Sequence, residues 1–328
     1  MKFLIAGFGS IGRRHMRNLL ALGEKDIVLY RTRKSTLDDA ELAGFPMETS
    51  LDAALAHRPD AVIIANPTAL HLDVAIPAAE AGCAILMEKP VSHNLERIDA
   101  LRAAVARGGN RLLVGFQFRF HPGLQKVAEL LHAQAIGRPL AVHAHWGEYL
   151  PNWHPWEDYR QSYSARADLG GGVVVTLSHP LDYLRWLLGE VSGLWAFAGH
   201  FSDLEVEVDD LAEIGLRFAS GATGGLHLNY VQQPPVHRLE IVGSGGSITW
   251  DNADGAARLF QAEQGAWEVF APPPGFERND LFLAEMRHFI DVARGAAQPL
   301  CSLEDGIRAL ELALAVHESA RGERIVRL

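Results

Sequence analysis

Residues 1–12 have the sequence MKFLIAGFGSIG, in which a short apolar run leads directly into a G-x-G-x-x-G motif. Gly7 allows a tight turn after a strand, Gly9 lets the backbone approach a pyrophosphate, and Gly12 allows a helix to pack closely on the strand. An alternative is a glycine-rich turn without a ligand, but the position between strand and helix favours a dinucleotide. We predict that Gly7, Gly9, Ser10, Ile11 and Gly12 hold the pyrophosphate at a helix N-terminus.

Residues 1–121 alternate short apolar runs with longer segments of helical period. The predicted strands are Phe3–Ala6, Ile27–Tyr30, Ala61–Ala65, Ala84–Met87 and Leu112–Gly115, and the predicted helices are Gly12–Leu22, Leu70–Ala81 and Leu95–Ala106. This alternation is typical of βαβ units. We therefore predict an α/β fold in which residues 1–121 form a doubly wound parallel sheet, the Rossmann dinucleotide-binding domain.

The pattern changes in residues 122–328. Predicted strands at Pro139–Tyr149, Trp195–His200, Leu211–Phe218, Ala222–Tyr230, Arg238–Val242 and Ser247–Trp250 follow a helix at Gly123–Ala133, and a helix at Leu303–Ala320 precedes an apolar tail at Ile325–Leu328. Glycine-rich links between the strands indicate hairpins. We predict a second α/β domain over residues 122–328 with a large, mainly antiparallel open sheet.

Composition narrows the class of partner. The 328 residues are 48% apolar and 21% charged, with a formal net charge of −10, which disfavours nucleic acid as a partner. Cys83 and Cys301 are too few for a disulfide framework. Since we find neither a signal-peptide pattern nor about 18 uninterrupted apolar residues, we expect a cytoplasmic protein without membrane contact.

The segment after the second predicted strand bears on the choice of cofactor. An NAD enzyme usually places an acid there to bind the ribose 2′-hydroxyl, but this chain has Arg31-Thr32-Arg33-Lys34-Ser35. Basic and hydroxyl groups suit a 2′-phosphate, and a guanidinium can also stack on adenine. The alternative is a solvated basic loop. We predict that Arg31, Thr32 and Arg33 select NADP(H), with NAD(H) as the competing cofactor.

Glu88-Lys89-Pro90 follows the fourth predicted strand, at the sheet edge where ligands bind in open α/β folds. A lysine beside a nicotinamide is partly desolvated and close to a cationic ring, so it loses its proton more easily. An isolated lysine before a helix is usually a surface residue. The position of Lys89 nevertheless makes it a candidate catalytic residue beside the nicotinamide.

Several further motifs occur in order along the chain. They are Ala65-Asn66-Pro67-Thr68 with His71, Gly115-Phe116-Gln117-Phe118-Arg119-Phe120, and Gly170-Gly171-Gly172 leading to Ser178-His179-Pro180-Leu181-Asp182-Tyr183. Together with the glycine fingerprint and Glu88-Lys89-Pro90, they make the chain resemble the Gfo/Idh/MocA family of pyridine-nucleotide oxidoreductases over essentially its whole length. The resemblance implies a Rossmann domain followed by an α/β substrate-binding domain, whose open sheet often forms the interface of a homodimer or homotetramer.

The resemblance also implies roles for single residues. Lys89 matches the catalytic lysine, and His179 matches a histidine that exchanges a proton with the substrate hydroxyl while hydride passes to or from nicotinamide. Positions that line the nicotinamide and its ribose are matched by Asn66, Pro67, Thr68, His71, Glu88 and Gln117.

One position departs from the family pattern. The family often has an aspartate three or four residues before the histidine, where this chain has Thr176. A threonine hydroxyl can bind a sugar hydroxyl or a ring nitrogen but carries no charge. Orientation of His179 could fall instead to Asp182, one helical turn onward. The alternative for His179 is a purely structural histidine.

An aromatic segment precedes the glycine triplet and suits carbohydrate, because aromatic faces cover the apolar side of a sugar ring while Arg and Tyr bind its hydroxyls. The alternative is an aromatic subunit contact. With two neighbouring motif positions, the candidate substrate residues are Arg119, Trp153, Trp156, Tyr159, Tyr163 and Thr176. His143, His145 and His154 lack a carboxylate at ligand spacing, so we predict no metal.

We therefore expect an NADP(H)-dependent oxidoreductase that acts on a secondary alcohol or ketone of a sugar, cyclitol or sugar derivative. Lys89 would polarise the substrate oxygen and His179 would transfer the proton. Two alternatives stay open. One is a dinucleotide-binding sensor without catalysis, suggested by Thr176, and the other is a family member that cleaves glycosides while recycling its cofactor.

Overall fold

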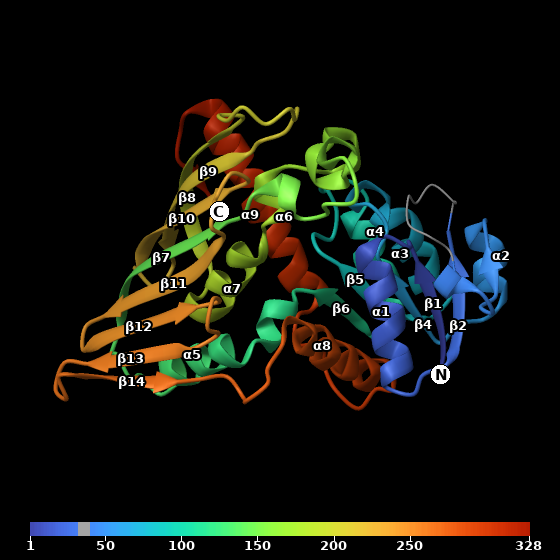
Figure 1. The fold of residues 1–328 in the computed structure, drawn as a ribbon, viewed down its shortest axis with the longest axis horizontal. Helices are drawn as coiled ribbons and strands as arrows, with labels where there is room; N and C mark the ends of the chain where they lie inside the picture. The colour runs from blue at the N-terminus through green and yellow to red at the C-terminus, as the bar shows by residue number, and fades with distance from the viewer. Residues whose placement is uncertain (32–39) are drawn as a thin grey trace. The chain divides into compact units, whose positions relative to one another are not determined.

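The computed structural model describes residues 1–31 and 40–328 and divides into two compact units (Figure 1). Unit 1 comprises Met1–Gln117 and Arg278–Leu310, and unit 2 comprises Phe118–Glu277 and Glu311–Leu328. Each unit has its own sheet, so the predicted α/β fold with two separate sheets is confirmed.

Unit 1 is built on a six-stranded sheet with the order β3-β2-β1-β4-β5-β6. The strands are β1 (Lys2–Ala6), β2 (Asp26–Tyr30), β3 (Met47–Glu48), β4 (Ala61–Ile64), β5 (Ala84–Glu88) and β6 (Leu112–Gly115). All are parallel, and Phe3 of β1 lies opposite Ile27 of β2 and Ala61 of β4. The strand order reverses between β1 and β4: β2 and β3 are added on one side of β1, and β4 to β6 on the other. Doubly wound folds bind their ligands at this point.

The helices of unit 1 cover strands that are almost completely buried. They are α1 (Ser10–Ala21), α2 (Leu51–Ala56), α3 (His71–Glu80), α4 (Ile98–Arg107) and α8 (Arg278–Ala293), with the start of α9 (Leu303–Gly322). Helix α3 pairs with α4 against β4 and β5, whereas α8 pairs with α1 and also contacts β5 and β6. Phe282, Met286 and Phe289 recur at helical spacing on the buried side of α8, which explains why this late segment belongs to the first unit.

Unit 2 is built on a nine-stranded sheet with the order β14-β13-β12-β11-β7-β10-β9-β8-β15. The strands are β7 (Pro139–Gly147), β8 (Val191–Gly199), β9 (Leu211–Phe218), β10 (Thr223–Asn229), β11 (Val236–Gly243), β12 (Gly246–Asp251), β13 (Ala257–Gln261), β14 (Ala266–Phe270) and β15 (Val326–Arg327). The pair β7 and β10 is parallel, and the other strand pairs within this described sheet are antiparallel. The predicted large, mainly antiparallel sheet is therefore confirmed.

One face of this sheet is buried under helices. They are α5 (Pro122–His132), α6 (Val173–Thr176), α7 (His179–Leu188) and the second part of α9, and short 3₁₀ turns occupy Leu150–Asn152, Tyr159–Gln161, Tyr163–Ala165 and Ala167–Leu169 (Figure 1). Along β9, Ala212, Ile214 and Leu216 are buried while their neighbours are not. The opposite face carries exposed aromatic rings, including Trp195 and Phe197 of β8. This alternation is the signature of a half-solvated antiparallel sheet.

Residues 278–310 were expected in the second domain, whereas the compact units place them with the first. The strands β13 and β14 were not predicted. In β14 the alternating apolar residues Trp267 and Val269 are exposed, so this strand has no buried face. Within the described residues, no helix combines the length and the apolar character needed to cross a bilayer.

Candidate active site

The glycine motif forms the turn between β1 and α1. Gly7 has φ +97°, and a Cβ built there would lie 2.5 Å from the backbone nitrogen of Asn66. A Cβ at Gly12 would lie 2.0 Å from the carbonyl oxygen of Gly7. At Gly9, by contrast, a Cβ would meet nothing within 4 Å. Two glycines therefore serve internal packing, while Gly9 leaves its outer side open to a ligand.

The N-terminus of α1 follows at once and has the properties of an anion site. Gly9 is the N-cap residue, and no side chain caps the first turn, which contains no acid. Ser10 and Ile11 are the first helical residues, so their backbone N–H groups lie at the positive end of the helix dipole. The geometry suits a pyrophosphate.

The segment that follows β2 is only partly described. Arg31 donates its backbone N–H to the carbonyl oxygen of Glu48 at 3.1 Å, and its side chain is buried. Thr32 and Arg33 lie outside the described residues. The predicted 2′-phosphate contacts therefore stay a prediction.

His71 connects the loops that follow β4 and β5. Its Nε2 lies 3.0 Å from the carbonyl oxygen of Asn66, and its Nδ1 lies 2.9 Å from that of Pro90. Burial lowers the pKa of this imidazole. His71 thus holds together two loops beside the glycine turn. One loop contains Pro67 and Thr68, and the other contains the Lys89–Pro90 peptide bond, which is cis.

Glu88 ends β5, and Lys89 follows it directly. The Glu88 carboxylate is nearly buried, and its Oε1 lies 2.7 Å from Nε2 of His15 on α1. His15 lowers the pKa of Glu88, against the effect of burial. Gln117, also buried, follows β6 at the same edge of the sheet. The carboxyl ends of β1, β4, β5 and β6 thus gather Lys89 and those predicted cofactor residues that follow these four strands.

Unit 2 holds the second set of candidates, beginning with His179 at the start of α7. The imidazole is 2% exposed. Its ring centroid lies 5.0 Å from that of Phe118 and 5.5 Å from that of Trp146. His179 is thus positioned by aromatic packing, which restricts the orientation of its ring.

Asp182 and Arg119 form a buried ion pair. Nε of Arg119 donates to Oδ2 of Asp182 at 2.9 Å and Nη2 donates to Oδ1 at 2.7 Å, with both side chains at most 4% exposed. Two parallel hydrogen bonds hold these groups in a fixed geometry. Arg119, predicted to contact substrate, thus has an internal role in connecting the segment after β6 to α7.

Thr176 lies at the end of α6 and is buried. The phenol of its neighbour Tyr230 donates to the carbonyl oxygen of Ser164 at 3.4 Å, and burial raises the pKa of that phenol well above its usual value. Asp209 accepts a hydrogen bond from the backbone N–H of Val174 at 2.9 Å. Tyr230 and Asp209 were not predicted from sequence, since both come from strand ends far along the chain.

The predicted aromatic residues lie in the 3₁₀-rich segment of unit 2. The Trp153 ring packs edge-on against Tyr230 at 5.4 Å, and the Tyr159 hydroxyl accepts a hydrogen bond from the backbone of Glu205. Trp156 and Tyr163 are 64% and 38% exposed. This segment therefore combines rings anchored to the unit with rings accessible to a ligand.

The three histidines considered as metal ligands come from β7 and from the segment that follows it. His143 and His145 alternate with buried residues along β7, and His145 packs against His227. His154 lies beside Trp156. Sequence reasoning missed a different group, His15 with Glu88 and Glu285. The signal was a glutamate on the apolar side of α8, between Phe282 and Phe289.

The glycine loop, the uncapped helix and the strand order define a dinucleotide-binding protein of the Rossmann class. Residues 1–116 match a family model described as "Oxidoreductase family, NAD-binding Rossmann fold", and residues 124–249 match "GFO/IDH/MocA C-terminal domain". The chain belongs to the GFO/IDH/MocA family of oxidoreductases, and it is an NAD(P)-dependent dehydrogenase or reductase acting on CH–OH groups.

Known relatives extend over the whole chain. Myo-inositol 2-dehydrogenase of Thermotoga maritima is 28% identical, with 100% of this chain and 98% of the relative covered. An uncharacterized oxidoreductase of Synechocystis, sll0816, is 32% identical over 75% of this chain and 68% of its own. Levoglucosan dehydrogenase, solved with NADH and levoglucosan, has a TM-score of 0.88 at 22% identity and covers 100% of this chain and 99% of its own.

Proposed function

We propose that this oxidoreductase transfers hydride between the nicotinamide of NADP(H) and a secondary alcohol or ketone of a sugar, cyclitol or sugar derivative. Full-length relatives named for myo-inositol and scyllo-inositol support the substrate class. The exposed rings of Trp156 and Tyr163 suit the apolar side of a sugar ring.

The observation that carries the proposal is the position of Lys89. It follows the buried strand β5 directly, at the edge of the sheet that also bears the glycine turn and the loop of Asn66. Nicotinamide, when bound, supplies the hydride chemistry. The Lys89 ammonium donates a hydrogen bond to the substrate oxygen and polarises it, and His179 takes up or returns the hydroxyl proton.

The preference for NADP(H) rests on charge at the end of β2. The sequence from Tyr30 through Ser35 contains three basic residues and no acid, which favours a 2′-phosphate over a 2′-hydroxyl. The solved levoglucosan dehydrogenase carries NADH. NAD(H) is therefore the competing cofactor in any test.

The test is a calorimetric titration of nucleotide-stripped protein with NADPH and NADH in parallel. We expect tighter binding of NADPH, and we expect Arg33→Ser to abolish that preference. The matched control is Arg107→Ser, which removes an exposed arginine at the end of α4. Equal or tighter binding of NADH by the unmodified protein would overturn the NADP(H) assignment, and failure to bind either would overturn the proposed function.

The substrate class is tested with the preferred cofactor in oxidised and reduced form. Inositols, aldoses, anhydrosugars and their ketones are screened by the absorbance of the reduced nicotinamide. Turnover of at least one polyhydroxylated ring is expected, and its absence across the panel would contradict the assignment. Cleavage of a glycoside without net change in the cofactor would point instead to internal hydride recycling.

We also propose that the exposed face of the nine-stranded sheet joins copies of the chain into a homodimer or homotetramer. Trp195 and Phe197 are 37% and 58% exposed, and their rings pack together at 4.2 Å on this face. Exposed aromatic rings are common at interfaces. Sedimentation analysis of the unmodified protein and of Phe197→Asp tests this proposal. We expect the variant to shift towards the monomer. If the unmodified protein is itself a monomer, the proposal is contradicted.

A further inference from the structure

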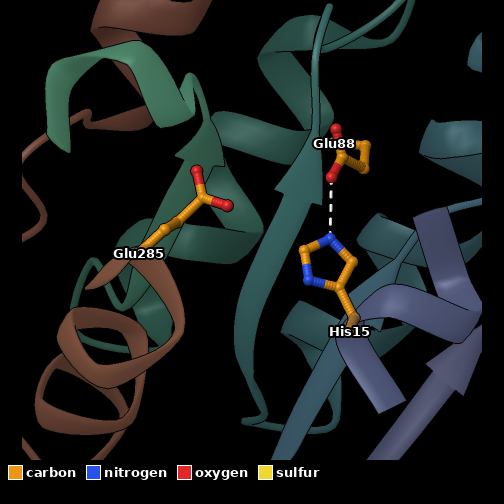
Figure 2. Close-up of side chains that lie close together, drawn as sticks. All are labelled: His15, Glu88 and Glu285. Atoms are coloured by element: carbon orange, nitrogen blue, oxygen red, sulfur yellow. Dashed lines mark hydrogen bonds and ion pairs between the residues drawn. The ribbon is translucent and has the colours of Figure 1, made fainter. Parts of the chain in front are cut away.

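Three ionisable side chains meet inside unit 1. His15 comes from α1, Glu88 from the end of β5 and Glu285 from the middle of α8. Figure 2 shows the Glu285 carboxylate turned towards the pair formed by His15 and Glu88. One nitrogen or carboxylate oxygen from each residue lies within 4.8 Å of the other two. Segments far apart in sequence thus converge on one point.

Burial makes this group costly as it stands. Glu285 and His15 are both 0% exposed. Among the described residues, neither oxygen of Glu285 has a hydrogen-bond partner, and neither has Nδ1 of His15. A buried carboxylate without partners is strongly destabilising unless something compensates for the lost water. The site therefore has unused coordinating capacity of a kind that folded proteins rarely leave unused.

A proton can remove the charge of Glu285 but does not satisfy its atoms. Burial and the neighbouring Glu88 raise the pKa of Glu285 well above its usual value. A protonated carboxyl would then need an acceptor for its O–H, and neither of its oxygens has a hydrogen-bond partner among the described groups. A divalent cation would instead engage both carboxylates and the imidazole together, and would balance two negative charges.

We propose that His15, Glu88 and Glu285 form a binding site for a divalent transition-metal cation, with Zn²⁺ as the favoured ion. One imidazole and two carboxylates are ligands that Zn²⁺ accepts, with a water molecule in the fourth position. The three ligand atoms already lie within 4.8 Å of one another. The cation would tie α1, β5 and α8 together at Glu88, the residue before Lys89, so its role is to hold the sheet edge in place rather than to take part in hydride transfer.

The test measures cation uptake rather than turnover. Tag-free protein is freed of metals by a chelator and dialysed, then titrated with Zn²⁺ by calorimetry and with Co²⁺ by visible absorption. We expect one equivalent per chain and a Co²⁺ spectrum typical of low coordination number. Glu285→Gln keeps the shape of the side chain but weakens its ligation, and we expect at least a 100-fold loss of affinity with the circular dichroism spectrum unchanged.

A second histidine–glutamate pair in the same unit provides the control. Nε2 of His57 lies 2.8 Å from Oε1 of Glu48, but both side chains are about one third exposed. His57→Asn should leave cation uptake unchanged. If Glu285→Gln does not fold, His15→Gln provides the same test.

Three results would overturn the proposal. They are no stoichiometric uptake by the unmodified protein, uptake that survives Glu285→Gln, and uptake lost in His57→Asn. A Glu285→Gln protein that is more stable while the unmodified protein takes up no cation would show that Glu285 holds a proton instead. Because cofactor binding and turnover are measured separately, failure of this site leaves the proposed reaction intact.

Discussion

Replacement of Gly12 by alanine separates the packing role of the glycine motif from its binding role. The new Cβ would lie 2.0 Å from the carbonyl oxygen of Gly7 and 3.0 Å from its carbon. Both atoms belong to backbone, so relief requires α1 to move by about 1 Å, and overpacking of this kind costs about 1–3 kcal/mol. The better helix propensity of alanine returns up to ~1 kcal/mol. We expect a net destabilisation of about 2 kcal/mol.

The matched substitution is Gly9→Ala. Its Cβ would meet no protein atom within 4 Å, and Gly9 has φ −74°, which any residue adopts. We expect a loss of stability of no more than ~1 kcal/mol, which is the usual difference between glycine and the poorer N-cap alanine. The methyl group would nevertheless occupy space that a pyrophosphate needs. We expect the dissociation constant for the nicotinamide cofactor to rise at least about tenfold, which corresponds to ~1.4 kcal/mol.

Thermal melts without cofactor and calorimetric titrations with it distinguish the two variants. Gly12→Ala should melt about 4–8 °C lower, on the scale of 2–4 °C per kcal/mol for units of this size. Gly9→Ala should melt close to the unmodified protein and bind cofactor weakly. Unchanged melting of Gly12→Ala would refute the steric reasoning, and unchanged affinity of Gly9→Ala would refute the placement of the pyrophosphate.

Three further predictions concern charge. Lys89→Ala should lower kcat at least about 100-fold, the range of general acid–base contributions, with the calorimetric cofactor affinity retained; wild-type turnover would exclude Lys89 from the reaction. Asp182→Asn should cost about 3–5 kcal/mol in urea unfolding because it leaves the Arg119 charge buried and unpaired, whereas a cost below ~1 kcal/mol would show that water reaches the pair. Burial lowers the pKa of His121 to about 4, so the unfolded state binds more protons between pH 4 and 6.5; stability should fall by about 3 kcal/mol as pH drops through that range, and His121→Asn, which keeps a cap for Gly123, should flatten this slope. An equal slope in that variant would assign it to other groups.

The fold was predictable wherever local sequence dictates it. Alternating apolar runs and helical segments predicted five of the six strands of the first sheet, because parallel strands buried on both faces need continuous Val, Ile and Leu. The two-residue strand β3 and the short helix α2 were not predicted, since neither is long enough to show a period. The strand β14 escaped, since an exposed edge strand carries no such run. Helix α8 was missed because its buried face is interrupted by Glu285.

The candidate site was predictable in part for the same reason. Gly7, Gly12 and Lys89 could be proposed from sequence alone, because their spacing from the predicted strands can be read directly from the sequence. The partners of Thr176 and Arg119 could not, because Tyr230 and Asp182 approach them only through tertiary packing. Sequence spacing does not encode such long-range pairs.

The return of residues 278–310 to unit 1 has a consequence for how the chain is made. Helix α8 contacts α1, β5 and β6, so the nucleotide-binding unit lacks part of its core until those residues have left the ribosome. The strands of unit 2 up to β14 are synthesised before that. Domains usually complete themselves in order from the N-terminus. Here the unit that begins first is completed late. The apolar surface that α8 covers therefore stays uncovered while nearly half of the protein is synthesised.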